Sequence, residues 1–309
     1  FGGGHATTMT DTVHAIDLKT GTTWADLYTP TPCSAMTAAN VDTLKGAWLS
    51  GPSGPYPRPL GTHTYGLVTF APDQNELVLL GRKSAQGALC GQNISDNITG
   101  PVAHFNMAAR SWAFSPDTTS TDIIGPIPAA DFDPVSKKMI VLGRGGLILY
   151  DPATRQSSTP VIQLTTSSGA PFDTQTLLFY ADHMTYFPPT DRFYYFARTG
   201  QVFELALNRA NPAASKIDEI ATSGPNPASL GEFGFAYDSK NGVIGGGVTG
   251  GAFYIFKPQT RTWSALTIPG GSPGDMAFHN IVYDPINNVF LFRTTYEAGQ
   301  RTWAFRYKN

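Results

Sequence analysis

The sequence predicts an all-β protein built as one repeating array, and three observations support this prediction. An aromatic residue, a polar turn containing proline or asparagine, and an apolar run follow one another five times, at intervals of 46 to 62 residues. Charged residues make up only 14% of the chain, whereas glycine occurs 32 times and proline 24 times, which suits short strands and tight turns. The intervals are those of four-stranded propeller blades with variable loops, and closed β architectures often reach 309 residues around one core. The repeated aromatic residues are Phe70, Phe132, Phe187, Tyr237 and Tyr283.

Each repeat predicts four strands, A to D. The turn after the aromatic residue should join an inner strand A to strand B, because Asp-Pro and Asn-rich pairs form turns and both flanks are rich in β-formers. A third strand, C, then leads into a second turn, and in three copies a tryptophan opens strand D and is expected to serve packing: Trp24, Trp112 and Trp263. Strand B is predicted at residues 77–81, 139–143, 193–197, 243–247 and 289–292. The C–D segments are predicted at residues 16–24, 105–112, 150–156 and 256–263.

These repeats predict a single propeller domain over residues 1–309, with six four-stranded antiparallel blades or remnants of blades. Full blades are expected at residues 59–116, 124–166, 172–222 and 230–268, and a last unit at 275–309. The first unit, residues 1–30, has no recognisable strand A, which would leave an unpaired edge at the central channel. We expect sequence upstream of Phe1 to supply this strand, which leaves an incomplete seventh blade open; the alternative is a neighbouring protein chain.

The glycines that end strand B and the tryptophan after the C–D turn resemble the kelch-type β-propeller, of the superfamily of the galactose oxidase central domain. The glycine group is clear at Gly2–Gly4 and at Gly245–Gly247. The resemblance covers the whole chain and implies the fold. It does not imply one activity, because kelch propellers include oxidases, lyases and protein-binding modules.

Charge and missing motifs exclude several classes of function. A net charge of −2 and a pI near 6.3 give no drive toward nucleic acid. No apolar run approaches the ~20 residues that span a bilayer. Phosphate-binding loops, dinucleotide fingerprints, zinc-protease helices and serine-hydrolase elbows are absent from the sequence, so we expect no cofactor and no metal site.

Strand alternation should bring a ring of polar residues to one mouth of the channel, where strand A begins and strand B ends. Propeller ligands usually bind at such a mouth. These groups could act as bases, acids or ligands, or could simply bond to the backbone between blades. His14 and His104 are expected in C strands, in structural roles. The ring comprises His63, Tyr65, Asp131, Asp182, His183, Glu232, His279 and Asn280.

Four arginines follow strand B and are expected on the same rim. A guanidinium matches a carboxylate, sulfate or phosphate with its planar fork of donors, so this set suggests an anionic ligand. The alternative is an ion pair between each arginine and a neighbouring blade. The four residues are Arg82, Arg144, Arg198 and Arg293.

Cys33 and Cys90 are the two cysteines, and both are expected in loops on the same face of adjacent blades, where a disulfide would anchor them. Two glycosylation-type tripeptides begin at Asn93 and Asn97. Together these features indicate an extracellular or periplasmic setting.

Three functions fit these residues. The first is a module that binds an anionic glycan or an acidic protein segment through the rim arginines. The second is a polysaccharide lyase, in which Arg198 or Arg144 neutralises a uronate, His183 or His279 is the base, and Tyr65 is the acid. The third is a structural subunit of an extracellular appendage or virion. The residues alone do not decide whether the protein is an enzyme.

Overall fold

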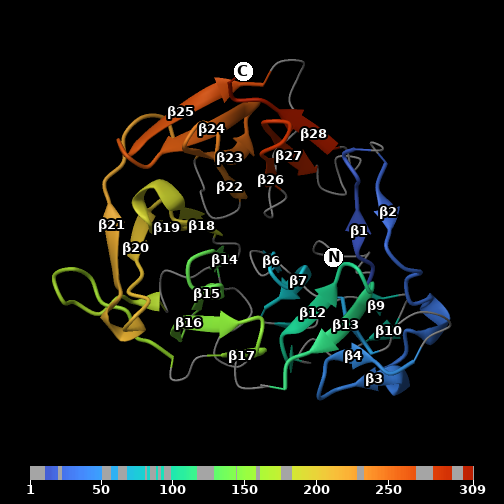
Figure 1. Cartoon of the computed structure of the whole chain (residues 1–309). Helices are drawn as coiled ribbons and strands as arrows, with labels where there is room; N and C mark the ends of the chain where they lie inside the picture. Colours follow the sequence, from blue (N-terminus) through green and yellow to red (C-terminus); the bar gives the residue numbers. More distant parts are fainter. Residues whose placement is uncertain are drawn as a thin grey trace.

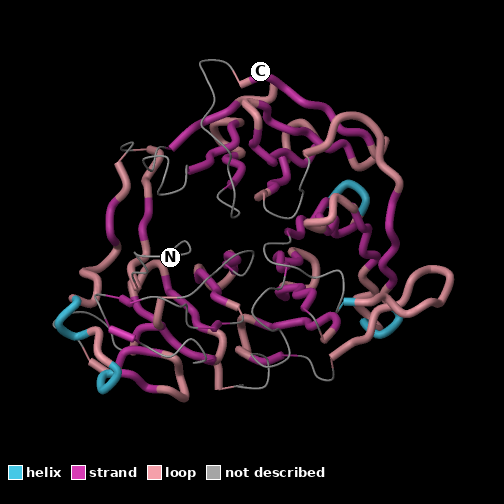
Figure 2. The backbone as a smooth tube through the Cα atoms, turned by 180° about the vertical axis from the view of Figure 1, so that it is seen from behind, coloured by secondary structure: helices cyan, strands magenta, loops and turns pink. Residues whose placement is uncertain are grey.

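The sheets of the computed structural model are arranged radially around a central axis, which confirms the predicted all-β propeller (Figure 1). Short 3-10 helices lie in the connections (Figure 2). The structure describes residues 11–19, 23–50, 57–61, 68–80, 82–83, 88–89, 92–93, 99–116, 129–143, 145–157, 161–174, 183–227, 233–268, 281–293 and 302–308.

Four antiparallel sheets have four strands each in the described part of the chain, in the order A, B, C, D from the axis outward. We number the blades by their place in the sequence. Blade 2 contains β6 (Val68–Ala71), β7 (Glu76–Leu79), β12 (Ala103–Asn106) and β13 (Ser111–Phe114). Blade 3 contains β14 (Ala129–Asp133), β15 (Lys138–Gly143), β16 (Gly146–Asp151) and β17 (Gln156–Ser157). Blade 4 contains β18 (His183–Phe187), β19 (Arg192–Phe196), β20 (Val202–Ala206) and β21 (Lys216–Ile220). Blade 5 contains β22 (Phe235–Asp238), β23 (Val243–Thr249), β24 (Ala252–Lys257) and β25 (Thr262–Thr267).

The remaining sheets are smaller. Blade 6 has three described strands, β26 (Ile281–Asp284), β27 (Val289–Arg293) and β28 (Thr302–Phe305), and blade 1 has two, β1 (His14–Ala15) and β2 (Ala25–Asp26). A long B–C arm of blade 2 pairs β8 (Arg82–Lys83) with β11 (Thr99–Gly100), and β9 (Ala88–Leu89) with β10 (Gln92–Asn93). The connection from blade 1 to blade 2 holds a further small sheet that the sequence did not predict, made of β3 (Val41–Asp42), β4 (Ala47–Trp48) and β5 (Arg58–Pro59).

The A–B turns share one conformation, which explains their sequence pattern. Asp133, Asp238 and Asp284 each end an inner strand and accept backbone N–H bonds from the residues two and three positions later. Such side chains replace the missing backbone partners of a turn. The last turn residue has a positive φ of 52° to 64° in each of the five described A–B turns: Asn75, Lys137, Asp191, Gly242 and Asn288.

This conformation corrects the alignment of the third repeat, which belongs to blade 4, by one residue. The positive-φ residue lies five positions after Phe70, Phe132, Tyr237 and Tyr283, and five positions before Asp191 stands Tyr186 rather than Phe187. Strand pairing agrees, since Tyr186 pairs with Phe193, seven residues later, as Phe132 pairs with Met139. Adjacent strand residues point to opposite faces, so Tyr186 is the equivalent aromatic residue.

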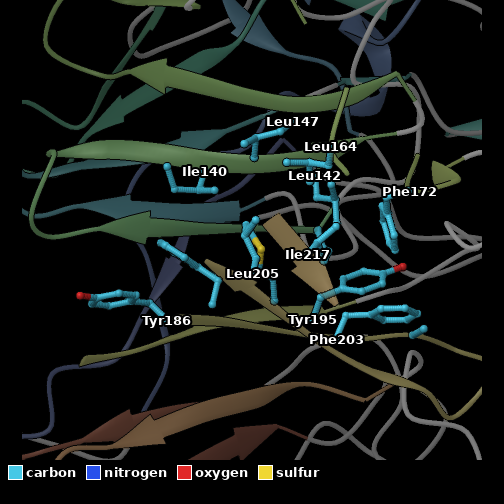
Figure 3. Close-up of a cluster of buried hydrophobic side chains, with 14 of the residues drawn as sticks. Ile140, Leu142, Leu147, Leu164, Phe172, Tyr186, Tyr195, Phe203, Leu205 and Ile217 are labelled. Carbon is cyan, nitrogen blue, oxygen red and sulfur yellow. The ribbon is translucent and has the colours of Figure 1, made fainter. Parts of the chain in front are cut away.

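The core is divided into layers between consecutive blades. Five apolar clusters join blades 1 and 2, 2 and 3, 3 and 4, 4 and 5, and 5 and 6 in the described part of the chain. Figure 3 shows the layer between blades 3 and 4, where Leu142 and Leu147 face Tyr195 and Leu205. The inner strands β6, β14, β18, β22 and β26 follow one another around the axis. Each blade is therefore held by its neighbours, and the strand ends of successive blades lie at the same two faces.

Candidate functional site

The corrected alignment gives three of the four predicted arginines the same position in the repeat. Arg82, Arg144 and Arg198 each follow their blade aromatic, Phe70, Phe132 or Tyr186, by 12 residues. The B strands of blades 2, 3 and 4 therefore lead into a B–C connection that has an arginine at the same place. Arg82 begins β8, and Arg144 lies outside the described residues.

Arg198 lies in a tight turn between β19 and β20. The turn is closed by the bond from the Gly200 N–H to the Ala197 carbonyl (2.9 Å) and by the positive φ of 91° at Gly200. The Arg198 side chain is exposed. Gln201, which follows the turn, donates to the Glu219 carboxylate at 3.0 Å. The turn thus places an exposed arginine directly after β19.

Arg293 occupies a different position. It follows Tyr283 by 10 residues, where blades 2, 3 and 4 have the buried apolar residues Leu80, Leu142 and Phe196. These three side chains pack against the next blade. The Arg293 guanidinium likewise turns toward the next blade, blade 1, and lies 5.1 Å from the centre of the Trp24 ring. Arg293 is therefore part of a blade contact and does not share the position of the other three arginines.

His183 begins the inner strand of blade 4 and is half-buried against the inner strand of blade 5. Its Nε2 is 3.0 Å from the Thr185 hydroxyl, which donates to the Phe235 carbonyl at 3.2 Å. Burial lowers the pKa of His183 to about 4, although a backbone contact with Phe235 opposes this shift. His183 is neutral at pH 7 and joins two inner strands.

Asp131 makes a similar link between blades 3 and 4. One carboxylate oxygen accepts the Phe132 N–H and the other accepts the Tyr186 N–H, both at 2.7 Å. Burial raises the pKa of Asp131 to about 6, because desolvation and the nearby charge of Asp133 outweigh these two bonds. Asp131 and Thr185 both precede the blade aromatic by one residue, so this position connects neighbouring inner strands.

The remaining predicted site residues lie outside the described part of the chain. They are His63, Tyr65, Asp182, Glu232, His279 and Asn280, together with Cys90. Cys33 starts a 3-10 helix, Cys33–Ala35, and is not a free thiol. The Cys33–Cys90 disulfide itself stays a prediction. Trp112 and Trp263 are buried in layers between blades, as expected for packing residues.

A buried relay that the sequence did not reveal links blades 2 and 3. Tyr150 lies with its hydroxyl 2.6 Å from His104 Nε2, while His104 Nδ1 is 2.8 Å from the Glu76 carboxylate. Arg155 donates to the other Glu76 oxygen at 3.0 Å. His104 and Tyr150 are fully buried, so the relay is structural, and the expectation of a structural His104 agrees with this position.

Two further clusters of charged side chains, around Arg58 and Arg209, link segments that are distant in the sequence. Arg58 is fully buried, 3.6 Å from the Asp11 carboxylate, and stacks on Tyr28 with 4.4 Å to the ring centre. Arg209 donates to the carboxylates of Asp133 and Asp191 with bonds of 2.6 to 3.0 Å. Arg58 begins β5, in the small sheet between blades 1 and 2, and Arg209 lies in the connection between β20 and β21. Asp11 is 47 residues from Arg58, and Asp133 and Asp191 are 76 and 18 residues from Arg209, so no local sequence pattern predicts these contacts.

The described residues contain no group of three or more His, Cys, Asp or Glu side chains placed to hold a metal ion. In the same part of the chain, none of the helices has the length and apolar character to cross a membrane.

Comparisons with known proteins bear on the fold. No protein-family model matches the sequence, and no curated protein matches it. The structure is similar to a protein of unknown function from Bacteroides thetaiotaomicron, with 11% identity and a TM-score of 0.50 over 77% of this chain and 58% of that one. An auxiliary nutrient binding protein from the same organism gives 12% identity and a TM-score of 0.41 over 81% and 71% of the two chains. The β-propeller domain of Cps50 (Swd1) from Myceliophteria thermophila gives 14% identity and a TM-score of 0.44 over 74% of this chain and 61% of that one. This chain thus spans less than two thirds of the first of these structures.

Proposed function

We propose that this protein is a binding module that holds an anionic ligand on the face where strands B end. The observation that carries the proposal is the equivalence of Arg82, Arg144 and Arg198, which stand 12 residues after the aromatic of three consecutive blades. Radial symmetry brings equivalent positions to one face. Three guanidinium groups there would offer paired donors to carboxylate or sulfate groups at repeated intervals.

An anionic glycan fits this arrangement best. Uronates and sulfated sugars repeat their charge along the chain, and the three arginines repeat theirs from blade to blade. An acidic protein segment is the alternative ligand. The kelch type, the single domain over residues 1–309, and an extracellular or periplasmic location with a Cys33–Cys90 disulfide belong to the same proposal.

The lyase is the second candidate function, and the lowered pKa of His183 is an argument against His183 as its base. A general base works best when its pKa lies near the working pH. The pKa of His183 is lowered to about 4, and its Nε2 contacts Thr185 between two blades. His183 is therefore a poor candidate for the base, while His279, the other candidate, lies outside the described residues. We retain binding without reaction as the proposed function, and Arg198 is the described residue through which it is tested.

The test is affinity electrophoresis and calorimetry with polygalacturonate, alginate, chondroitin sulfate and poly-glutamate, with neutral dextran as the uncharged control. Arg198→Ala should weaken binding to the preferred polyanion about tenfold, which corresponds to one lost charged contact of ~1.4 kcal/mol. Added salt should weaken it further.

Arg192→Ala is the matched control, because Arg192 begins β19 at the end opposite to the Arg198 turn. Its side chain is 37% exposed and lies 3.7 Å from Glu204. Equal losses in both variants would refute the site, and absence of binding to every polyanion would refute the function. Growth of unsaturated-uronate absorbance would select the lyase. Binding to poly-glutamate alone would select the acidic protein ligand.

A further inference from the structure

The outer strand of blade 5, β25, is covered along only part of its edge by the described residues. β25 is the last strand of its sheet and lies on the outside of the ring (Figure 1). On the side away from β24, the described residue that pairs with it is Ser223, through a parallel bridge to Thr262. Trp263 donates its N–H to the Ser223 carbonyl at 2.7 Å, and the Ser223 N–H bonds to the Arg261 carbonyl at 3.1 Å. The beginning of the edge is therefore closed by the connection that follows blade 4.

The bond of Trp263 also shows which backbone groups point outward. In an antiparallel ladder, alternate residues direct their N–H and C=O groups to the same side. Trp263 directs its N–H away from β24, so Ala265 and Thr267 do the same. Ile268 agrees with this alternation, because its N–H points inward to the Gly251 carbonyl at 3.1 Å. Ala265 and Thr267 are both exposed, and within the described ranges no residue bonds to their outward groups.

The outer strands of the other complete blades have features that protect a sheet edge. Natural sheets avoid pairing with further chains by means of short edge strands and charged side chains. β17 has two residues and β13 has four, whereas β25 has six. β21 has five residues, but three of them are charged, namely Lys216, Asp218 and Glu219. The sequence of β25, Thr-Trp-Ser-Ala-Leu-Thr, contains no charged residue and no proline. Its edge is therefore suited to pairing with another strand.

We propose that β25 pairs antiparallel with β25 of a second copy of this chain, so that two four-stranded blades become one continuous sheet. Ala265 and Thr267 are the open positions, so the two-fold axis lies at Leu266. This axis places Ala265 of each copy opposite Thr267 of the other, and each such pair exchanges two N–H···O bonds. The same surface is used on both copies, as a two-fold interface requires. This inference goes beyond the proposed ligand binding and does not depend on it.

The residues of β25 fit a second copy of the same strand. Leu266 would stand opposite Leu266 of the other copy, and Ala265 opposite Thr267, so no two charges meet. Leu266 already packs in the apolar layer between blades 5 and 6, and the leucine pair would extend this layer. An antiparallel pair of two β21 strands about Asp218 would instead bring like carboxylates together, which is destabilising. Self-pairing is thus compatible with β25 and is opposed at β21.

The first test is sedimentation of the full chain over a range of concentrations. Ala265→Pro removes an outward N–H and no bond to β24, because proline is tolerated where the N–H of an edge strand faces solvent. Thr267→Lys places a charge on the open edge and keeps the backbone N–H. Gln259→Lys is the matched control, since Gln259 is exposed in the turn between β24 and β25 and adds the same charge away from the edge.

The second test fixes the register. Residues directly opposite each other in an antiparallel pair have Cα atoms about 4.5–5.5 Å apart, which a disulfide can span. Leu266→Cys should therefore form a covalent dimer under mild oxidation. Ser264→Cys is the control, because Ser264 lies on the same side of the strand but would stand opposite Ile268 of the other copy. Equal cross-linking of both variants would overturn the proposed register.

We expect the native chain to dimerise reversibly, and Ala265→Pro and Thr267→Lys to raise the dissociation constant about tenfold or more. Gln259→Lys should leave it unchanged. Thr267→Lys alone decides the matter if Ala265→Pro lowers the Tm. A chain that stays monomeric up to its solubility limit would overturn the proposal, and so would a dimer that Thr267→Lys leaves intact. A monomeric chain that binds a labelled peptide of residues 262–268, with loss of binding in Thr267→Lys, would replace the second copy by a strand of a different protein.

Discussion

The carboxylate of Asp131 accepts the backbone N–H of Tyr186 at 2.7 Å and thereby joins the inner strands of blades 3 and 4 beside the axis. The same position in blade 4 is Thr185, whose hydroxyl donates to the Phe235 carbonyl of blade 5. Neighbouring inner strands are therefore linked by short side chains as well as by apolar layers. In blade 6 this position is Val282, which cannot form such a bond.

The first prediction concerns the charge of Asp131. Its pKa is raised to about 6 from 3.8, so between these values the folded state binds a proton that the unfolded state has released. The contribution of Asp131 to the free energy of unfolding should thus fall as pH rises from about 4 to 6, by about 3 kcal/mol at most. Asp131→Asn removes this titration.

Urea unfolding of both proteins from pH 4 to 7 checks the prediction. The stability of the native protein relative to Asp131→Asn should decline over this range and level off above pH 6. A difference that is flat with pH, or that grows, would contradict it.

The second prediction concerns the buried relay of Tyr150, His104 and Glu76. Burial, which is the largest effect, and the charge of Arg155 lower the pKa of His104 to about 4 although Glu76 favours its protonation. The unfolded state takes up a proton near pH 6.5 while folded His104 does not, so this residue should cost stability as pH falls from 6.5 to 4.

Tyr150→Phe removes the hydroxyl next to His104 Nε2 and leaves a buried acceptor without its donor, which should cost about 1–3 kcal/mol at pH 7. Thermal unfolding measures the loss, and ring proton shifts of His104 should stay constant down to pH 5. A His104 that titrates near 6.5 would show that the relay is open to solvent.

The sequence predicted the repeat because its signals are local. The Asp that ends strand A caps its own turn, as Asp238 does for Lys240 and Asn241, so the turn is visible in five consecutive residues. The third repeat, in blade 4, has two adjacent aromatic residues, Tyr186 and Phe187, and the sequence pattern favours the wrong one. The positive φ at Asp191 and the pairing of Tyr186 with Phe193 decide between them.

The same one-residue shift also changes which candidate site residues are equivalent between blades. With Tyr186 as the reference, His183 precedes the blade aromatic by three residues and His279 precedes Tyr283 by four, so the two histidines are not equivalent. Side chains one residue apart on a strand point to opposite faces. The same correction makes Arg198 equivalent to Arg82 and Arg144, whereas Arg293 follows Tyr283 by 10 residues and has a different position in either alignment. Register is a property of strand pairing, and the local pattern did not contain it.

The third prediction concerns Arg209, which binds two carboxylates from different blades. Burial alone would raise the pKa of Asp133, but bonds from Arg209, Ser136 and the Val135 N–H outweigh it and hold this pKa below its ordinary value. Arg209→Ala would leave Asp133 buried without its cation and should cost about 3 kcal/mol. Urea unfolding measures this loss.

Asp133→Asn in the Arg209→Ala background should recover part of the stability, because the uncompensated charge is gone. Arg192→Ala is the control, since Arg192 makes a longer and more exposed ion pair with Glu204, of about 0–1 kcal/mol. Similar losses in Arg209→Ala and Arg192→Ala would show that the Arg209 bridge adds little.

The last prediction concerns Gly246 in β23, within the glycine group that resembles the kelch repeat. A Cβ atom at this residue would lie 2.0 Å from the Gly234 carbonyl oxygen and 2.9 Å from the Phe235 Cα, which are backbone atoms of the neighbouring chain segment. The backbone must therefore shift, and Gly246→Ala should lower the free energy of unfolding by about 3 kcal/mol.

Gly250→Ala is the matched control in the same hairpin, because its Cβ would meet nothing within 4 Å and only its φ of 58° is unfavourable, at about 1 kcal/mol. Differential scanning calorimetry should show a clearly lower Tm for Gly246→Ala. If both variants lose the same stability, close contact between β23 and the inner strand is not what requires glycine at this place, and conformational freedom alone explains the sequence pattern.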